Sequence, residues 1–87
     1  MRLAKYVKFR EEKFGGVLFE TRSEKVFTLN PTAAAVVREI ETGRSEREIA
    51  ARMKDRYEDP SSAIEREVLA LIADLRQKGL VEDAPRD

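Results

Sequence analysis

Three short stretches in the first third of the chain alternate apolar and polar side chains, which is the pattern of half-buried β-strands. The first runs from 5 to 10 and places Val7 and Phe9 on one face. The second spans 17–22 and the third spans 25–29. Because the connections between them are short, these strands are predicted to form an antiparallel meander with the second strand in the centre.

The segment 11–16 separates the first two stretches and is predicted to be a turn. It contains the pair Gly15-Gly16, and glycines permit a positive φ or a close approach of two backbone segments. In the third stretch Phe27 and Leu29 share one face, so this strand is also expected to be half-buried.

A helical period replaces the alternation after Asn30-Pro31, which is a strong helix start because Asn caps free N–H groups and Pro fits the first turn. The first helix is expected to end at Gly43. Ser45 and Glu48 form a capping box that begins a second helix. The apolar stripes of these two helices consist of Ala33, Val36, Val37 and Ile40, and of Ile49, Met53 and Tyr57.

The segment 58–62 contains Pro60 and is predicted to separate the second helix from a third, longer helix that ends near Gly79. Leu80 and Val81 follow and are available to pack back onto the fold. The core stripe of the third helix consists of Ile64, Val68, Leu71, Ile72 and Leu75. Leu69 lies just outside this stripe, either as an extension of the core or as part of a second apolar surface.

The order of elements predicts the fold class. A three-stranded antiparallel β-meander followed by three helices is an α+β domain with a winged helix-turn-helix-like arrangement. The expected domain covers residues 1–82, and 83–87 form a polar tail. The architecture alone does not select a function.

Composition removes most enzymatic chemistry. The chain of 87 residues has no Cys and no His, so disulfides, thiolate nucleophiles, imidazole bases and their metal sites are absent. No apolar run approaches the length of a membrane span, and the first residues do not resemble a signal peptide, so we expect a cytoplasmic protein. No cofactor is expected.

Two groups of carboxylates are the only candidates for acid/base or hard-metal chemistry. They are Glu11 with Glu12, and Asp55 with Glu58 and Asp59. Each group lies in a strongly charged stretch with no apolar pocket implied, so a solvated surface explains both better than a catalytic or metal site does.

DNA binding is one alternative function, because basic residues gather around the second helix. They are Arg44, Arg47, Arg52, Lys54 and Arg56. Acidic residues interleave with them, and the net charge of the chain is zero, with 17 basic and 17 acidic residues. The third helix, which would enter the major groove, opens with Glu65 and Glu67, which disfavours phosphate contact.

The third strand offers a better site. As an edge strand it has a free row of N–H and C=O groups, and it contains no Pro and one charge. Such an edge accepts an added strand from another chain. About five new hydrogen bonds at ~0.5 to 1.5 kcal/mol each do not cover the association cost, so side-chain anchors are also required. The same edge also permits a homodimer with a structural or regulatory role, which is a second alternative.

Three segments of the chain, 15–21, 25–33 and 43–50, resemble in order the PqqD-like family. They correspond to a Gly-Gly strand, a strand that ends in Leu29-Asn30 and a helix that contains Ile-Ala. Members of this family are precursor-peptide recognition elements, used in making ribosomally synthesised and post-translationally modified peptides. The resemblance implies a non-enzymatic peptide chaperone that binds a leader peptide as an added strand and presents it to a modifying enzyme, commonly a radical S-adenosylmethionine enzyme.

The family's site falls on the third strand and, by helical phase, on the third helix. The peptide-binding residues predicted in this way are Lys25, Val26, Phe27, Thr28, Leu29, Glu65, Leu69, Ile72 and Arg76. The reaction itself would belong to the modifying enzyme, in agreement with a chain that has no visible catalytic constellation.

Overall fold

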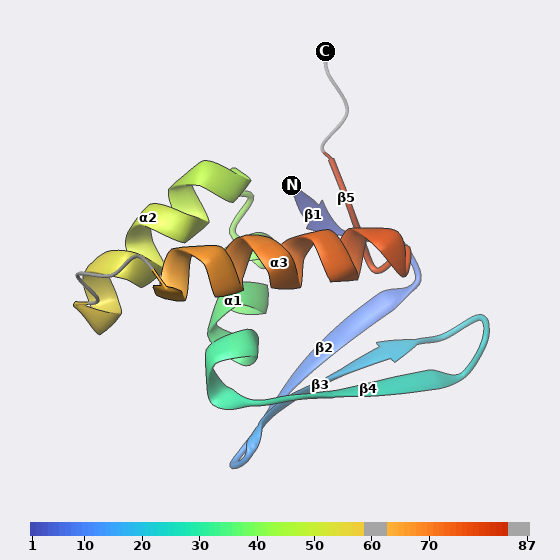
Figure 1. Cartoon of the computed structure of the whole chain (residues 1–87). Helices are drawn as coiled ribbons and strands as arrows, with labels where there is room; N and C mark the ends of the chain where they lie inside the picture. Colours follow the sequence, from blue (N-terminus) through green and yellow to red (C-terminus); the bar gives the residue numbers. More distant parts are fainter. Residues whose placement is uncertain (59–62, 84–87) are drawn as a thin grey trace.

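The computed structural model describes residues 1–58 and 63–83 as an α+β fold (Figure 1). The elements are β1 (Arg2–Leu3), β2 (Val7–Glu12), β3 (Gly15–Glu20), β4 (Lys25–Leu29), α1 (Pro31–Glu41), α2 (Glu46–Tyr57), α3 (Ala63–Gln77) and β5 (Val81–Glu82). The predicted three-stranded antiparallel sheet followed by three helices is confirmed. No helix in the described ranges has the length and apolar character that a membrane span requires.

The main sheet has the strand order β2-β3-β4, with β3 in the centre as predicted. Both pairs are antiparallel, and the register places Phe9 beside Leu18 and Leu18 beside Phe27. These three side chains point toward the helices, and Leu18 is fully buried. Figure 1 shows the helices gathered on one side of the sheet.

The predicted turn at 11–16 is shorter than expected. Glu11 and Glu12 pair with Gly16 and Gly15, so only Lys13 and Phe14 lie outside the ladder. The second strand therefore begins two residues before the predicted start at Val17 and ends at Glu20 instead of Arg22. The glycines are strand residues and not turn residues, and the close backbone approach that they were expected to permit is found beside Gly15.

Helix starts follow the predicted caps. Asn30 Oδ1 accepts a hydrogen bond of 2.8 Å from the backbone N–H of Ala33, and Pro31 is the first residue of α1. Ser45 and Glu48 form the predicted capping box on α2, with bonds of 3.1 and 3.0 Å. The backbone N–H of Ser45 lowers the pKa of Glu48. Of the predicted break at 58–62, residues 59–62 lie outside the described part of the chain.

The ends of the described chain meet in a small second sheet. β1 pairs antiparallel with β5, so that Arg2 lies opposite Glu82 and Leu3 opposite Val81. This sheet was not predicted, because strands of two residues are too short to give an alternating pattern. Leu80 and Val81 are buried, as the sequence predicted. The domain boundary at 82 stays a prediction, and residues 84–87 of the predicted tail lie outside the described part.

Helix α1 lies at the centre of the core. It contacts the main sheet, β1, α2 and α3, and its apolar residues belong to the same core cluster as theirs. The predicted stripe is buried, and so are Ala34 and Ala35, which lie outside it. Small alanine side chains allow this helix to be enclosed on most of its circumference.

Candidate functional site

A groove runs along the free edge of the main sheet, between β4 and α3. Its volume is about 500 Å³. The strand side of the groove is β4 itself, together with Asn30. The helix side consists of Leu71, Asp74, Leu75 and Lys78, with Leu80 and Ala33 completing the wall. Strand and helix thus form the two sides of an open channel.

β4 is an edge strand because its only ladder in the described chain is with β3. Its second row of backbone N–H and C=O groups therefore faces away from β3, toward the groove. Phe27 and Leu29 lie on the helix side, where Leu29 is buried, and Val26 is 58% exposed on the opposite side. Lys78 Nζ lies 5.7 Å from the centre of the Phe27 ring, so a cation from the turn just after α3 reaches the strand.

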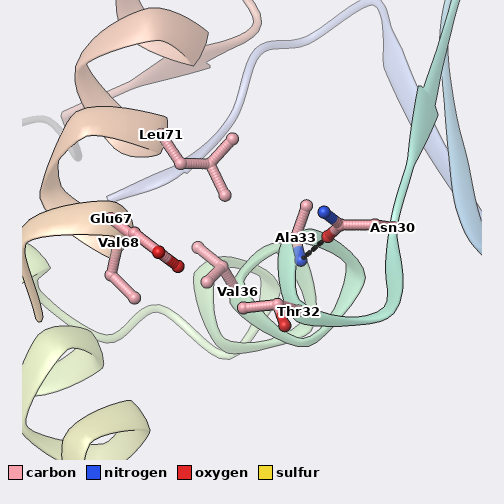
Figure 2. Close-up of a pocket in the computed structure, with 7 residues that line it drawn as sticks. All are labelled: Asn30, Thr32, Ala33, Val36, Glu67, Val68 and Leu71. Atoms are coloured by element: carbon pink, nitrogen blue, oxygen red, sulfur yellow. Dashed lines mark hydrogen bonds between the residues drawn. The ribbon is translucent and has the colours of Figure 1, made fainter. Parts of the chain in front are cut away.

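A smaller pocket of about 180 Å³ continues the groove beyond the end of β4. Figure 2 shows its lining residues, which come from the start of α1 and from α3: Asn30, Thr32, Ala33, Val36, Glu67, Val68 and Leu71. Three of these, Asn30, Ala33 and Leu71, also line the groove, so the two hollows are adjacent. The pocket is mainly aliphatic, with the Glu67 carboxylate at its side.

Three of the helix residues predicted for the site lie on the other flank of α3, against α2. Glu65 Oε2 is 3.9 Å from Lys54 Nζ, and Arg76 Nη2 is 3.6 Å from Glu46 Oε2. Leu69 lines a hollow between α2 and α3 and is 37% exposed. The structure therefore does not bring these three side chains to the groove beside β4.

The positions of these residues around the axis of α3 explain why they lie away from the groove. The buried stripe of α3 includes Ile72, which is fully enclosed in the core and was predicted to line the groove. Positions 65, 69 and 76 fall on one side of that stripe, and 71, 74 and 78 fall on the other. The sequence pattern locates the stripe but does not say which flank faces the strand. The spacing of Leu71, Asp74 and Lys78 at i, i+3 and i+7 is the signal that would have located the flank that lines the groove.

Three arginines of the basic cluster around α2, namely Arg44, Arg52 and Arg56, surround one buried carboxylate. Glu39 of α1 is 6% exposed, and it accepts hydrogen bonds from Arg52 Nε at 2.8 Å and Arg44 Nε at 3.0 Å. Arg56 Nη2 is 3.7 Å from the same group. The Arg52 hydrogen bond, with the charges of Arg52 and Arg44, holds the pKa of Glu39 below its usual value despite burial. These arginines link helices, which weakens their interpretation as a phosphate-binding flank.

The carboxylates considered as acid/base candidates lie at the surface. Glu11 pairs with Arg38 at 3.3 Å and Glu12 with Arg10 at 2.8 Å. Asp59, from the second group, lies outside the described residues. Within the described ranges no group of three or more His, Cys, Asp or Glu side chains is placed to hold a metal ion.

Among the described residues, Glu20 is a carboxylate whose pKa is strongly lowered. Its carboxylate accepts hydrogen bonds from the Ser23 hydroxyl and from the backbone N–H groups of Ser23 and Arg22. The Ser23 hydroxyl bond is the main cause that lowers the pKa of Glu20 to about 2. This carboxylate closes the turn between β3 and β4 and thereby fixes the start of the edge strand.

Two solved structures resemble the chain over most of its length. One, described as lasso peptide synthetase B1 complexed with the leader peptide, is 30% identical, with a TM-score of 0.77 over 91% of this chain and 93% of that one. The other, described as TbiB1 in complex with the TbiA(beta) leader peptide, is 20% identical and has a TM-score of 0.84 over 99% and 100% of the two chains. The second likeness concerns the fold alone.

No curated protein sequence matches the chain. The model of the family described as coenzyme PQQ synthesis protein D (PqqD) matches residues 15–81, which contain the main sheet from β3 onward, all three helices and the start of β5. The matched region includes both sides of the groove. The chain therefore belongs to the PqqD family.

Proposed function

We propose that this protein is a non-enzymatic peptide chaperone that binds the leader segment of a ribosomally made precursor peptide. The leader adds to β4 as a further strand, and its side chains enter the groove against α3. The observation that carries the proposal is the free edge of β4, which opens directly onto that groove. The similar structure described as a complex with a leader peptide supports it.

Favourable binding of a leader requires free energy both from hydrogen bonds along the β4 edge and from side chains buried in the groove. Added-strand hydrogen bonds along five residues contribute about 3 to 7 kcal/mol net, whereas association costs about 4 to 15 kcal/mol. Aliphatic side chains buried in the groove and in the pocket beside Leu71 add about 1.5 to 3 kcal/mol each. Alternate residues of an added strand point to the helix side, so two or three anchors per leader suffice.

The bound leader would then be presented to a modifying enzyme, which we propose to be a radical S-adenosylmethionine enzyme in the cytoplasm. In this account the chaperone supplies no catalytic group. We propose that Lys25 to Leu29 bind the peptide, as predicted from the sequence. We propose Leu71 and Asp74 of α3, and Lys78 directly after it, as peptide contacts in place of the flank that carries Leu69.

The test compares Leu71→Ser with Leu69→Ser, the same substitution on opposite flanks of one helix. The probe is a synthetic leader of the precursor peptide encoded beside this chain, titrated into isotope-labelled protein and followed by amide NMR and by calorimetry. We expect Leu71→Ser to weaken leader binding about tenfold or more, because it removes an aliphatic anchor. Leu69→Ser is expected to change affinity less than about twofold.

Chemical shift changes should concentrate at β4 and at residues 71–78, in the last turns of α3 and just after it. Larger weakening by Leu69→Ser would return the site to the α2 flank and contradict the proposed geometry. An unchanged spectrum with leader would exclude peptide binding, and shifts on α2 with duplex DNA would then favour a DNA-binding regulator. Self-association that is insensitive to peptide would favour the homodimer.

A further inference from the structure

The main sheet has a second face, turned away from the helices. The ladder aligns Lys8, Phe19 and Val26 in one row across this face, and Arg10, Val17 and Thr28 in the next. Phe19 is 37% exposed although it is a large aromatic residue. Lys8, Arg10, Val17 and Phe19 surround an open hollow of about 320 Å³, and we call these four residues the outer sheet patch.

The outer sheet patch is spatially independent of the peptide groove. It lies on β2 and β3, whereas the groove lies beyond β4 and on the helix side. A strand added to β4 would extend the sheet sideways by about 5 Å and leave the face of β2 and β3 uncovered. A peptide and a second partner would therefore bind at the same time.

The charge on the patch indicates the partner's chemistry. Lys8 has no ion pair within the described part of the chain, and Arg10, although paired with Glu12, has a side chain that is 83% exposed. Beside them, Lys5 Nζ and the Arg22 guanidinium lie 5.5 and 4.4 Å from the centre of the Tyr6 ring. Arg22 also pairs with Glu20 at 3.4 Å, so the excess positive charge of this basic rim comes mainly from Lys5 and Lys8, in a chain whose net charge is zero.

A second copy of the chain fits this surface poorly. Two outer sheet patches packed face to face would bring Lys8 and Arg10 of one copy near the same cations of the other, and like charges at such a contact are unfavourable. A partner with an apolar centre and carboxylates at its edge matches both the exposed Phe19 and the basic rim.

We propose that the outer sheet patch is the docking surface for the peptide-modifying enzyme, which contacts Val17 and Phe19 with apolar side chains and pairs carboxylates with Lys8 and Arg10. The inference rests on the proposed function, because a chaperone that delivers its peptide needs a second contact surface. It assigns the leader to the β4 edge of the sheet and the enzyme to its outer face, and it predicts a complex of all three components.

The experiment measures binding of purified protein to the modifying enzyme encoded beside this chain, with and without the synthetic leader, by biolayer interferometry. The variants are Lys8→Glu and Phe19→Ser. Their matched controls are Arg47→Glu on α2 and Leu69→Ser on α3, which make the same kinds of change on another surface. Leader affinity is measured for every variant, since retained leader binding shows that the fold is intact.

We expect both patch variants to weaken enzyme binding about tenfold or more and both controls to change it less than about twofold. Leader affinity should stay within about twofold for Lys8→Glu and Phe19→Ser. Enzyme affinity of the unaltered protein should fall when salt rises from about 50 to 300 mM, and Lys8→Glu should reduce that dependence.

Three outcomes would overturn the inference. They are unchanged enzyme binding by both patch variants, no enzyme binding by the unaltered protein, and self-association that Phe19→Ser abolishes, which would identify a second copy as the occupant. A protein that binds enzyme through the patch but binds no leader would contradict the proposed function while the docking surface is retained. The two proposals therefore fail in different measurements.

Discussion

At the scale of single residues, Gly15 shows how one position fixes the geometry beside the candidate site. Its φ is +141°, a region that residues with a Cβ rarely adopt. A Cβ at this position would lie 2.1 Å from the carbonyl oxygen of Leu29 and 2.6 Å from the carbonyl carbon of Asn30. The end of β4 and the start of α1 can take their places only because this side chain is missing.

We expect Gly15→Ala to lower the free energy of unfolding by about 2 to 4 kcal/mol, from backbone strain and from the clash with Leu29 and Asn30. Gly43→Ala is the matched control. Gly43 also has a positive φ, +82°, but an added Cβ meets nothing within 4 Å, so only about 1 kcal/mol of strain is expected. Urea unfolding followed by circular dichroism measures both, and equal losses would show that the close approach is unimportant.

At the scale of elements, Glu39 connects α1 to α2. It is the one charged residue among the buried side chains of the described chain, and Arg52 and Arg56 of α2 together with Arg44 of the preceding loop surround it. A buried carboxylate needs this many donors because burial alone would favour its protonated form. The arginines remain partly exposed, so the contact lies at the margin of the core.

Because the folded pKa of Glu39 is depressed, its ionised form stabilises the fold above the usual value of 4.5, and that contribution is lost as pH falls below it. We expect Glu39→Gln to reduce the free energy of unfolding by about 1.5 to 3 kcal/mol at pH 7. The difference between the two proteins should shrink in urea unfolding below about pH 4. A difference that is independent of pH would mean that the ionised group contributes nothing.

At the scale of the whole molecule, β1 and β5 join the two ends of the described chain and close the core. Arg2 Nε is 2.9 Å from Glu82 Oε1, and the backbone N–H of Ala4 donates to the carbonyl of Leu80 at 2.9 Å. Val81 is 3% exposed, so this closure buries apolar surface from the last element. The pairing of β1 with β5 thereby holds the chain just after the C-terminal end of α3 against the rest of the fold.

We expect Val81→Ala to lower the free energy of unfolding by about 2 kcal/mol, because it removes two buried carbon atoms and leaves a cavity. The control is Val26→Ala, the same change in an edge strand where the side chain is 58% exposed. Its cost should stay below about 0.5 kcal/mol. Thermal and urea unfolding measure both variants, and comparable losses would indicate that the small sheet does not close the core.

Features that depend on near neighbours in the sequence were predicted, whereas features that depend on long-range contacts were not. The capping residues Asn30 and Ser45 begin their helices as predicted, because a cap depends only on neighbours within four residues. The edge strand from Lys25 to Leu29 was predicted with its exact limits. The turn at 11–16 was misjudged because Gly15 lies close to Leu29 and Asn30 and Gly16 lies close to Phe9, which no local pattern reports.

By itself, the sequence determined the order of elements, the α+β class, the free edge of β4 and the likeness to the PqqD family. These follow from periodicity, capping and order along the chain, which are local properties. Only the tertiary structure decided which flank of α3 faces β4, that Ile72 is enclosed, and that Glu39 gathers three arginines. The helical pattern of α3 does not distinguish the two flanks of its buried stripe. In the folded chain one flank packs against α2 and carries Leu69, and the other faces β4, so Leu71 lines the groove.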